Sequence, residues 1–166
     1  FQTTRALSTA QTVEAAFGHA AQHVRQETPA AVCALFVHDP GAGVVRCIGA
    51  AGEKSELLYG LEIKVGERIT GWAASHLQPI ANSDAALDLG PLAGAFRSRL
   101  RSALVIPLMN RDKVLGVISA YAIDENAFRN EHRYAVEQIC GTLSAKLEEL
   151  LHPEAPTLLK FSPRKA

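Results

Sequence analysis

The residues best suited to chemistry lie in one polar loop near the middle of this chain. Asn82, Asp84 and Asp88 place an amide and two carboxyl groups close together in the sequence. Asp84 and Asp88 stand at positions i and i+4, a spacing that could support general acid–base catalysis. The sequence shows no nucleophile or metal ligand to act with them, so we expect ligand binding rather than catalysis.

The same loop has a structural interpretation. Asn82 or Ser83 could cap the turn that follows Pro79, which would leave Asp84 and Asp88 solvated. Loops on rigid scaffolds often carry binding residues. Both interpretations stay open at this stage.

A second group of polar residues follows in the segment "FRSRLRS". If this segment is extended, Arg97, Arg99 and Arg101 share one face and could hold a phosphate or a carboxylate. The alternative is an exposed approach to the next strand. We include Arg97 and Arg101 among the candidate ligand contacts.

Trp72 is the only tryptophan and lies on a predicted helix from Arg68 to Leu77. Ile69, Trp72, Ala73 and Leu77 recur at helical spacing, which predicts that Trp72 faces the core. Packing against a sheet is the favoured interpretation, and stacking on a ligand is the alternative.

The cysteine and histidine patterns give little support to metal or redox chemistry. Cys33 and Cys47 fall in apolar runs typical of strands, and Cys140 falls on the apolar stripe of the last helix. No C-x-x-C pair exists, so we expect free buried thiols in a reducing cytoplasm. A redox pair of Cys33 and Cys47 across a hairpin is a minor alternative. His19 and His23 have metal-binding spacing, but no third ligand is visible and we expect no metal.

Composition excludes several classes of function. Seventeen basic residues balance seventeen acidic ones, so no net field attracts nucleic acid or an anionic membrane. The longest apolar run, at residues 30–37, is far too short to span a bilayer. The chain opens on Phe1 rather than Met, so we expect a fragment of a longer protein.

The pattern of elements predicts an α+β domain at residues 1–151, followed by a Pro-rich linker or tail at 152–166. Hairpins joined by short turns predict antiparallel strands, and the two long terminal helices should share one face of the sheet. The expected helices and strands are a helix at Ser8–Arg25, strands at 31–38, 44–50 and 61–65, a helix at Arg68–Leu77, a short extended segment at 79–82, strands at 102–109 and 113–122, and a helix at Phe128–Leu151.

The apolar pattern of the last helix continues further than a monomeric domain needs. Leu147, Leu150 and Leu151 would form a costly exposed patch, which predicts a partner helix. We therefore expect a homodimer whose interface contains Leu143 and these three residues.

Four stretches together resemble a GAF domain, the small-molecule sensor module of signalling proteins. They are "GERITGWAASHLQPIANSD", "RSALVIPLM", "DKVLGVISAYA" and "AFRNEHRYAVEQI". The resemblance covers roughly residues 8–150. It implies a six-stranded antiparallel sheet, with the terminal helices on one face and a ligand pocket under the helix and loop on the other. It also implies parallel dimerisation through the terminal helices and a neighbouring output domain.

Departures from the family pattern restrict the ligand. Ala120 and Tyr121 stand where members that bind cyclic mononucleotides carry Asn-Lys, so such a ligand is doubtful; Tyr121 is kept as a candidate contact. The loop at 89–102 has no cysteine, so no covalent bilin is expected. The ligand itself stays unknown.

We therefore expect a non-catalytic sensory domain of a bacterial signalling protein, with a two-component or cyclic-dinucleotide system among the possible settings. The alternatives are a dimerisation module that has lost its ligand and an enzyme that reduces free methionine sulfoxide. A pocket filled by the domain's own side chains would favour the first alternative.

Overall fold

The computed structural model of the chain describes residues 2–152, except the side chains of residues 2–4. Apart from His152, the predicted tail lies outside the described residues. The elements are α1 (Gln2–Thr9), α2 (Val13–Glu27), β1 (Val32–Asp39), β2 (Val44–Gly52), the 3₁₀ turn η1 (Ser55–Leu58), β3 (Glu62–Lys64), α3 (Arg68–His76), β4 (Ile80–Ser83), α4 (Ala86–Leu89), the 3₁₀ segment η2 (Gly90–Ala95), β5 (Ser102–Asn110), β6 (Lys113–Ala122) and α5 (Asn130–Leu151).

The strands form one six-stranded sheet in the order β3-β2-β1-β6-β5-β4. Every neighbouring pair is antiparallel. The predicted α+β fold with a six-stranded antiparallel sheet is therefore confirmed. Its central strands β1 and β6 carry nearly continuous apolar side chains, because both of their faces are covered.

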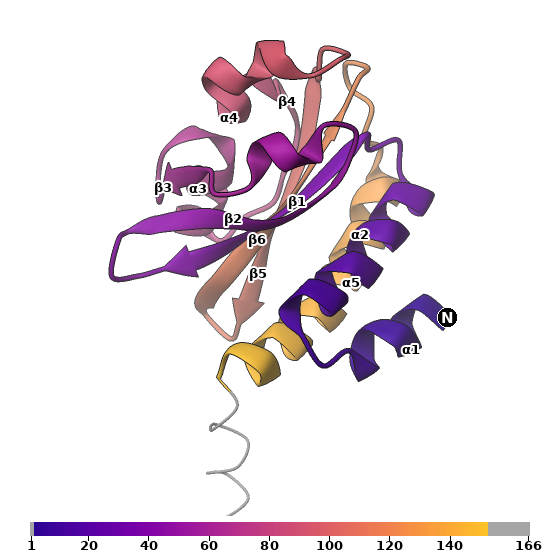
Figure 1. The fold of residues 1–166 in the computed structure, drawn as a ribbon, viewed down its shortest axis with the longest axis vertical. Helices are drawn as coiled ribbons and strands as arrows, with labels where there is room; N and C mark the ends of the chain where they lie inside the picture. Colours follow the sequence, from indigo (N-terminus) through magenta and orange to yellow (C-terminus); the bar gives the residue numbers. More distant parts are fainter. Residues whose placement is uncertain (1, 153–166) are drawn as a thin grey trace, which may run out of the picture.

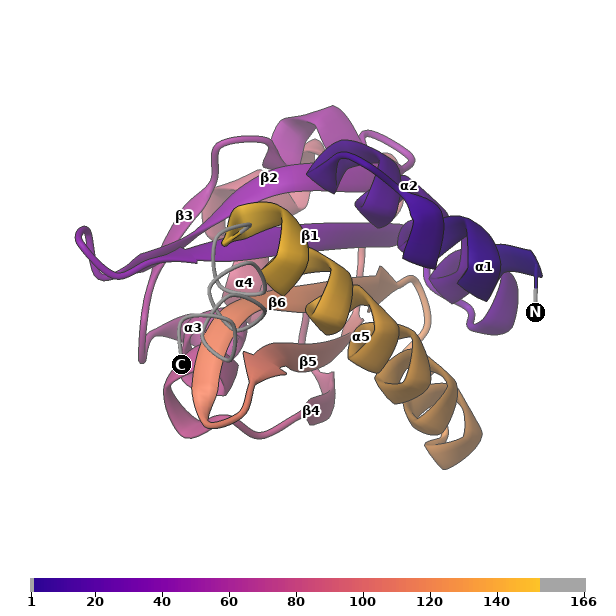
Figure 2. The same ribbon diagram turned by 90° about the horizontal axis from the view of Figure 1, so that it is seen from below.

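Helices cover the two faces of the sheet differently (Figures 1 and 2). The long helices α2 and α5 lie side by side on one face, with α1 packed against them. The shorter α3 and α4 lie on the other face. Each face has its own apolar core, and the core under α3 and α4 contains Phe36, Leu58, Ile63, Leu89 and Tyr121, all of them buried.

The amino-terminal helix differs from the prediction. One helix was expected over Ser8–Arg25 with Ser8 as its cap, but the structure breaks it into α1 and α2. Thr12 caps α2 by accepting a hydrogen bond from the Ala15 amide at 3.0 Å. The break places Leu7 in the core, where it is 2% exposed.

The end of α5 also requires a correction. The predicted exposed patch does not form, because Leu143 and Leu147 are fully buried in the core of a single copy. Leu150 and Leu151 are partly buried and pack against the same core. The helix α5 packs against β5, β6 and α2 at once. The apolar residues near its end are therefore needed for contacts within one copy of the chain.

No helix within residues 2–152 is long and apolar enough to cross a membrane.

Candidate ligand site around Asp88

Asp88 on α4 has a completely buried carboxyl group, which points to the start of α3. The backbone amides of Ile69 and Thr70 donate hydrogen bonds to its Oδ1 at 3.0 and 2.8 Å. The Tyr121 hydroxyl donates to Oδ2 at 2.7 Å, and the Thr70 hydroxyl donates to the same oxygen. Four donors therefore satisfy one carboxyl group in the interior.

The network extends to the central strand and to the surface. Thr70 Oγ1 lies 2.7 Å from the hydroxyl of buried Ser119 on β6. The Arg68 guanidinium donates to the backbone oxygen of Asp88 at 2.7 Å. These contacts connect α3, α4 and β6 through one acidic residue.

The start of α3 explains why a carboxyl group is stable here. The first amides of a helix have no partner within the helix and favour negative charge. No side chain at the N-cap residue Glu67 satisfies them. Asp88 does so from another element, and thus acts as a cap supplied from α4.

A glycine sets the distance of α3 from the sheet. A Cβ at Gly71 would lie 2.1 Å from the backbone oxygen of Lys64 and 3.1 Å from Ile63. Because Gly71 has no side chain, α3 can lie directly on β3. This brings its first turn within reach of Tyr121 and Ser119.

Tyr121 stays protonated in this environment. Burial raises the pKa of its phenol well above the usual value, and the neighbouring charge of Asp88 raises it further. The phenol is therefore a permanent donor to Asp88 at physiological pH. Two of the predicted ligand residues, Asp88 and Tyr121, are thus in direct contact with each other.

Trp72 departs from the prediction. It is 37% exposed and stacks on His76, with ring centroids 4.1 Å apart. The buried face of α3 is instead made by Ile69, Thr70, Gly71, Ala73 and Ala74. The small residues pack on the sheet and the indole points away, so Trp72 neither fills the core nor faces Asp88.

Asn82 has a structural contact that explains its type. Its amide donates to the Phe128 backbone oxygen at 2.7 Å, and its side-chain oxygen accepts from the Phe128 amide at 2.9 Å. These two bonds join the edge strand β4 to the segment that precedes α5. Asp84 accepts from the Ala86 amide at 3.0 Å and so supports the turn before α4.

The arginine row is partly brought together. Arg99 and Arg101 line one small surface cavity of about 190 Å³, which they share with Asn82, Asp84, Glu125 and Asn126. Arg97 points elsewhere and pairs with Glu53 at 3.6 Å. Residues 97–101 form no strand, and two of the three arginines line the same cavity.

The three cysteines lie on different sides of the sheet. Cys33 and Cys140 belong to the core under α2 and α5, whereas Cys47 belongs to the core under α3. In the β1–β2 register Cys33 pairs with Ala51 and Cys47 with Phe36, so the hairpin does not place the two thiols opposite each other. Burial raises the pKa of Cys33 to about 12 and that of Cys47 to about 11, so both remain thiols near neutral pH.

The two histidines of α2 do not form a metal cluster. His23 contacts Glu27 at 3.4 Å. In the part of the chain that the structure describes, no three His, Cys, Asp or Glu side chains are grouped so that they could hold a metal ion.

Sequence reasoning missed Arg68, Thr70 and Ser119. Thr70 directly follows the first residues of a predicted helix, where its hydroxyl and the free amides could have been expected to attract an acidic partner. Ser119 is a polar residue within an otherwise apolar strand, and this is the available signal for a buried hydrogen bond.

Comparison with known proteins identifies the family of the chain. The GAF domain family model matches residues 10–148, and the chain therefore belongs to the GAF domain family. A search of curated proteins returned no match.

Solved structures with the same fold come from several settings. The GAF domain from a phosphoenolpyruvate-protein phosphotransferase of Coxiella burnetii has a TM-score of 0.78 at 22% identity, covering 93% of both chains. Free methionine-R-sulfoxide reductase from Neisseria meningitidis, in complex with its substrate, has a TM-score of 0.72 at 16% identity, covering 92% of this chain and 87% of that one. The chromophore-binding domain of the R. palustris bacteriophytochrome RpBphP3 has a TM-score of 0.71 at 16% identity, covering 92% of this chain and 60% of that one. At these identities the likeness concerns the fold.

Proposed function

We propose that the chain is a non-catalytic sensory domain of a signalling protein, and that Asp88 closes its interior in the absence of a guest. The observation that supports this proposal is the fully buried Asp88 carboxyl group with its four donors. It lies on α4 and points to the start of α3, in the region where the ligand was expected. A guest would have to displace Asp88 from the start of α3.

The donors around Asp88 define the chemistry of such a guest. Release of Asp88 would leave two backbone amides, the Thr70 hydroxyl and the Tyr121 hydroxyl without their acceptor. Unsatisfied buried donors are costly, so the replacement must itself be a strong acceptor. We therefore propose a ligand with a carboxylate or another oxyanion, held at the amides of Ile69 and Thr70.

Displacement would also produce the signal. Asp88 lies on α4, so its release would free α4 and η2 from α3 and move the segment after them that carries Arg97 and Arg101. A ligand shifts this equilibrium only by its differential affinity for the open state. Its apparent affinity equals its affinity for the open state multiplied by the fraction of molecules that are open. Because that fraction is small, we expect this domain to bind its ligand weakly.

Chemical complementation tests the oxyanion position. Asp88→Gly removes the side chain but leaves the donors in place. We expect formate to raise the thermal midpoint of this variant in a saturable manner, because formate restores the missing carboxylate. Leu87→Gly is the matched control, since Leu87 lies on the same short helix and is 61% exposed; formate should not stabilise it. Equal responses of the two variants would overturn the proposed site.

The second candidate function is a dimerisation module without a ligand. The filled interior under α3 and α4 favours it, because the apolar side chains there already pack on the sheet. Native mass spectrometry of the freshly purified chain separates the two candidates. A bound molecule that is lost on denaturation would support the sensor. A chain without a bound molecule, whose hydrogen exchange does not change when carboxylates are added, would favour the dimerisation module.

The observations weigh against the third candidate, a reductase of free methionine sulfoxide. Reduction of a sulfoxide by cysteine requires the thiolate, which is the nucleophilic form of the side chain. Cys33, Cys47 and Cys140 are buried, and burial raises the pKa of each. We expect no turnover of free methionine sulfoxide by the wild-type chain or by a variant without the three thiols; activity lost in that variant would contradict this.

A further inference from the structure

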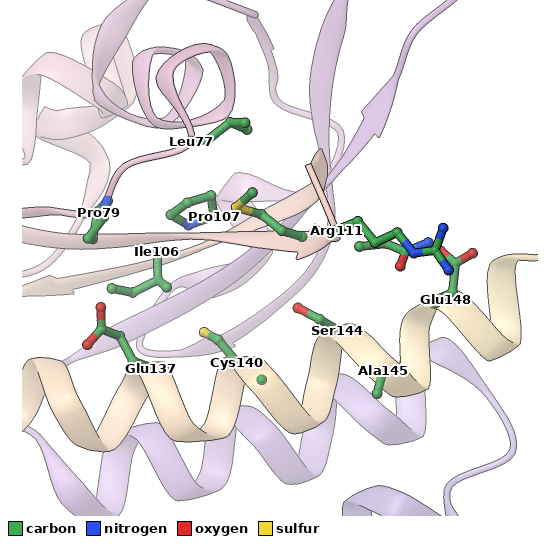
Figure 3. Close-up of a pocket in the computed structure, with 13 residues that line it drawn as sticks. Leu77, Pro79, Ile106, Pro107, Arg111, Glu137, Cys140, Ser144, Ala145 and Glu148 are labelled. Atoms are coloured by element: carbon green, nitrogen blue, oxygen red, sulfur yellow. The ribbon is translucent and has the colours of Figure 1, made fainter. Parts of the chain in front are cut away.

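A groove runs along α5 on the side away from α2. It consists of two adjoining hollows of about 650 and 900 Å³, both of which are lined by Asn110 and Glu148. Figure 3 shows the first hollow, with Glu137, Cys140, Ser144 and Ala145 along α5 and the β5 residues Ile106 and Pro107 opposite. The second hollow continues past the β5–β6 hairpin to Leu151 and His152 at the end of α5.

Glu148 is the polar anomaly of this groove. Its Oε2 is shielded from solvent and has no hydrogen-bond partner among the described residues. Buried polar atoms in native proteins are nearly always paired, so an unpaired carboxylate oxygen indicates a missing donor. Arg111 lies at the same end of the groove (Figure 3), yet no ion pair joins it to Glu148 within residues 2–152.

The rest of the lining specifies an apolar occupant that carries a cation. The α5 side presents the small residues Gly141, Ser144 and Ala145, which leave space for a larger side chain. Val37, Leu115 and Leu151 line the second hollow, so apolar area is available there as well. An occupant with an apolar body would cover these walls, and a positive group on it would pair with Glu148.

The geometry points to residues 153–166 of the same chain as the occupant of this groove. They continue directly from His152, which itself lines the second hollow. The segment "TLLKFSPRK" within them combines Leu158, Leu159 and Phe161 with Lys160, Arg164 and Lys165. This is the combination of apolar and cationic side chains that the groove and Glu148 require.

The length of the segment is sufficient. Fourteen residues follow His152, and an extended chain of that length spans about 45 Å. The groove from Glu148 back to Glu137 follows eleven residues of helix, or about 17 Å. The segment can therefore turn back at the end of α5 and place a basic side chain at Glu148. Docking would couple this groove to any chain that follows, independently of the Asp88 site.

A spin label tests the docking on the full chain. Ser162→Cys places an attachment point within the segment, whereas the three native cysteines are buried. We expect a nitroxide at this position to broaden the amide signals of Asn110 and Ala145 strongly. The amides of Tyr59 and Leu87, on the other face of the sheet, should stay sharp. Equal, weak broadening on both faces would overturn the proposal.

Mixing separates the chain's own segment from that of a second copy. Spin-labelled chain without ¹⁵N is combined with ¹⁵N-labelled wild-type chain, so that broadening reports contacts between molecules. We expect none at Asn110 and Ala145. Broadening that appears only in the mixture would assign the groove to a second copy and overturn the proposal.

Two matched variants test the role of Glu148. Glu148→Gln removes the charge with little change of shape and should weaken the broadening at Ala145 severalfold. Glu149→Gln is the control, because Glu149 is 61% exposed and pairs with Lys146 instead. If the two variants leave the broadening equally strong while the amide spectrum stays folded, the segment is not held by Glu148 and the proposal fails.

Discussion

The hydroxyl group of Tyr121 is one of the four hydrogen-bond donors that stabilise the buried carboxyl group of Asp88. Tyr121→Phe keeps the ring but leaves the Asp88 carboxyl group one donor short. We expect the free energy of unfolding to fall by about 1–3 kcal/mol. Urea titration measures the change, and Tyr134→Phe is the control, since Tyr134 is 67% exposed. A Tyr121→Phe variant as stable as the control would show that the network contributes little.

The buried thiols predict a loss of stability at high pH. The pKa of Cys33 is raised from 9.0 to about 12 and that of Cys47 from 9.0 to about 11, mainly by burial. Well below pH 9 both thiols are neutral in the folded and unfolded states, so their contribution is fully present. Above pH 9 the unfolded thiols ionise first and favour unfolding, until each folded thiol also titrates.

Each thiol should lower the free energy of unfolding by about 1.4 kcal/mol per pH unit within its window. Urea titrations from pH 8 to 11 measure the slope, and Cys33→Ala removes one contribution. An unchanged slope in Cys33→Ala would contradict the assignment, since the remaining titrating groups are the same in both chains.

At the scale of single residues, the contact between Asp88 and Tyr121 could not be predicted from the sequence. Asp88 and Tyr121 were both included as ligand contacts, but nothing in the spacing of residues 88 and 121 shows that they touch each other. Their contact depends on α3 lying close to the sheet, and Gly71 makes this possible. Thr70 and Ser119 were missed because small hydroxyl residues are common on surfaces and their burial is decided by the tertiary fold.

At the scale of elements, Asn82 determines how the edge strand is held. Asn82→Ala removes both bonds to the Phe128 backbone and also places alanine at φ 67°, which is unfavourable for a residue with a Cβ. We expect a loss of about 2 kcal/mol and faster hydrogen exchange at the Phe128 amide. Asn130→Ala, at the exposed start of α5, should change neither quantity. If the Phe128 amide exchanges in Asn82→Ala at the same rate as in the wild-type chain, the contact is dispensable.

The elements themselves were largely predictable, and the exceptions have physical causes. Apolar runs and alternation predicted five of the six strands, because strands buried on one or both faces carry a strong local pattern. The short edge strand β4 was expected only as an extended segment at 79–82. The break between α1 and α2 was missed because Ser8 and Thr12 are both good caps, and packing of Leu7 decides between them. Trp72 was assigned to the wrong face of α3, because the helix lies so close to the sheet that its small residues face inward.

At the scale of the whole molecule, the homodimer remains a prediction, and the structure changes where its interface can lie. Leu143 and Leu147 are fully buried within one copy, so a partner helix cannot contact them without unfolding the core. Leu150 is partly buried and stays within reach of a second copy near the end of α5. We therefore expect a pairing through α5 to use its last turn, where Leu150 lies.

Leu150→Glu tests this arrangement. A carboxylate in an apolar helix contact loses its hydration without gaining a partner, so we expect the dimer to dissociate at concentrations where the wild-type chain remains paired. Light scattering across a dilution series measures the mass. Leu87→Glu is the matched control, because Leu87 is exposed on the opposite face and its substitution should leave the dimer intact. A wild-type chain that stays monomeric at tens of micromolar would reject the dimer, and equal dissociation of both variants would move the interface away from α5.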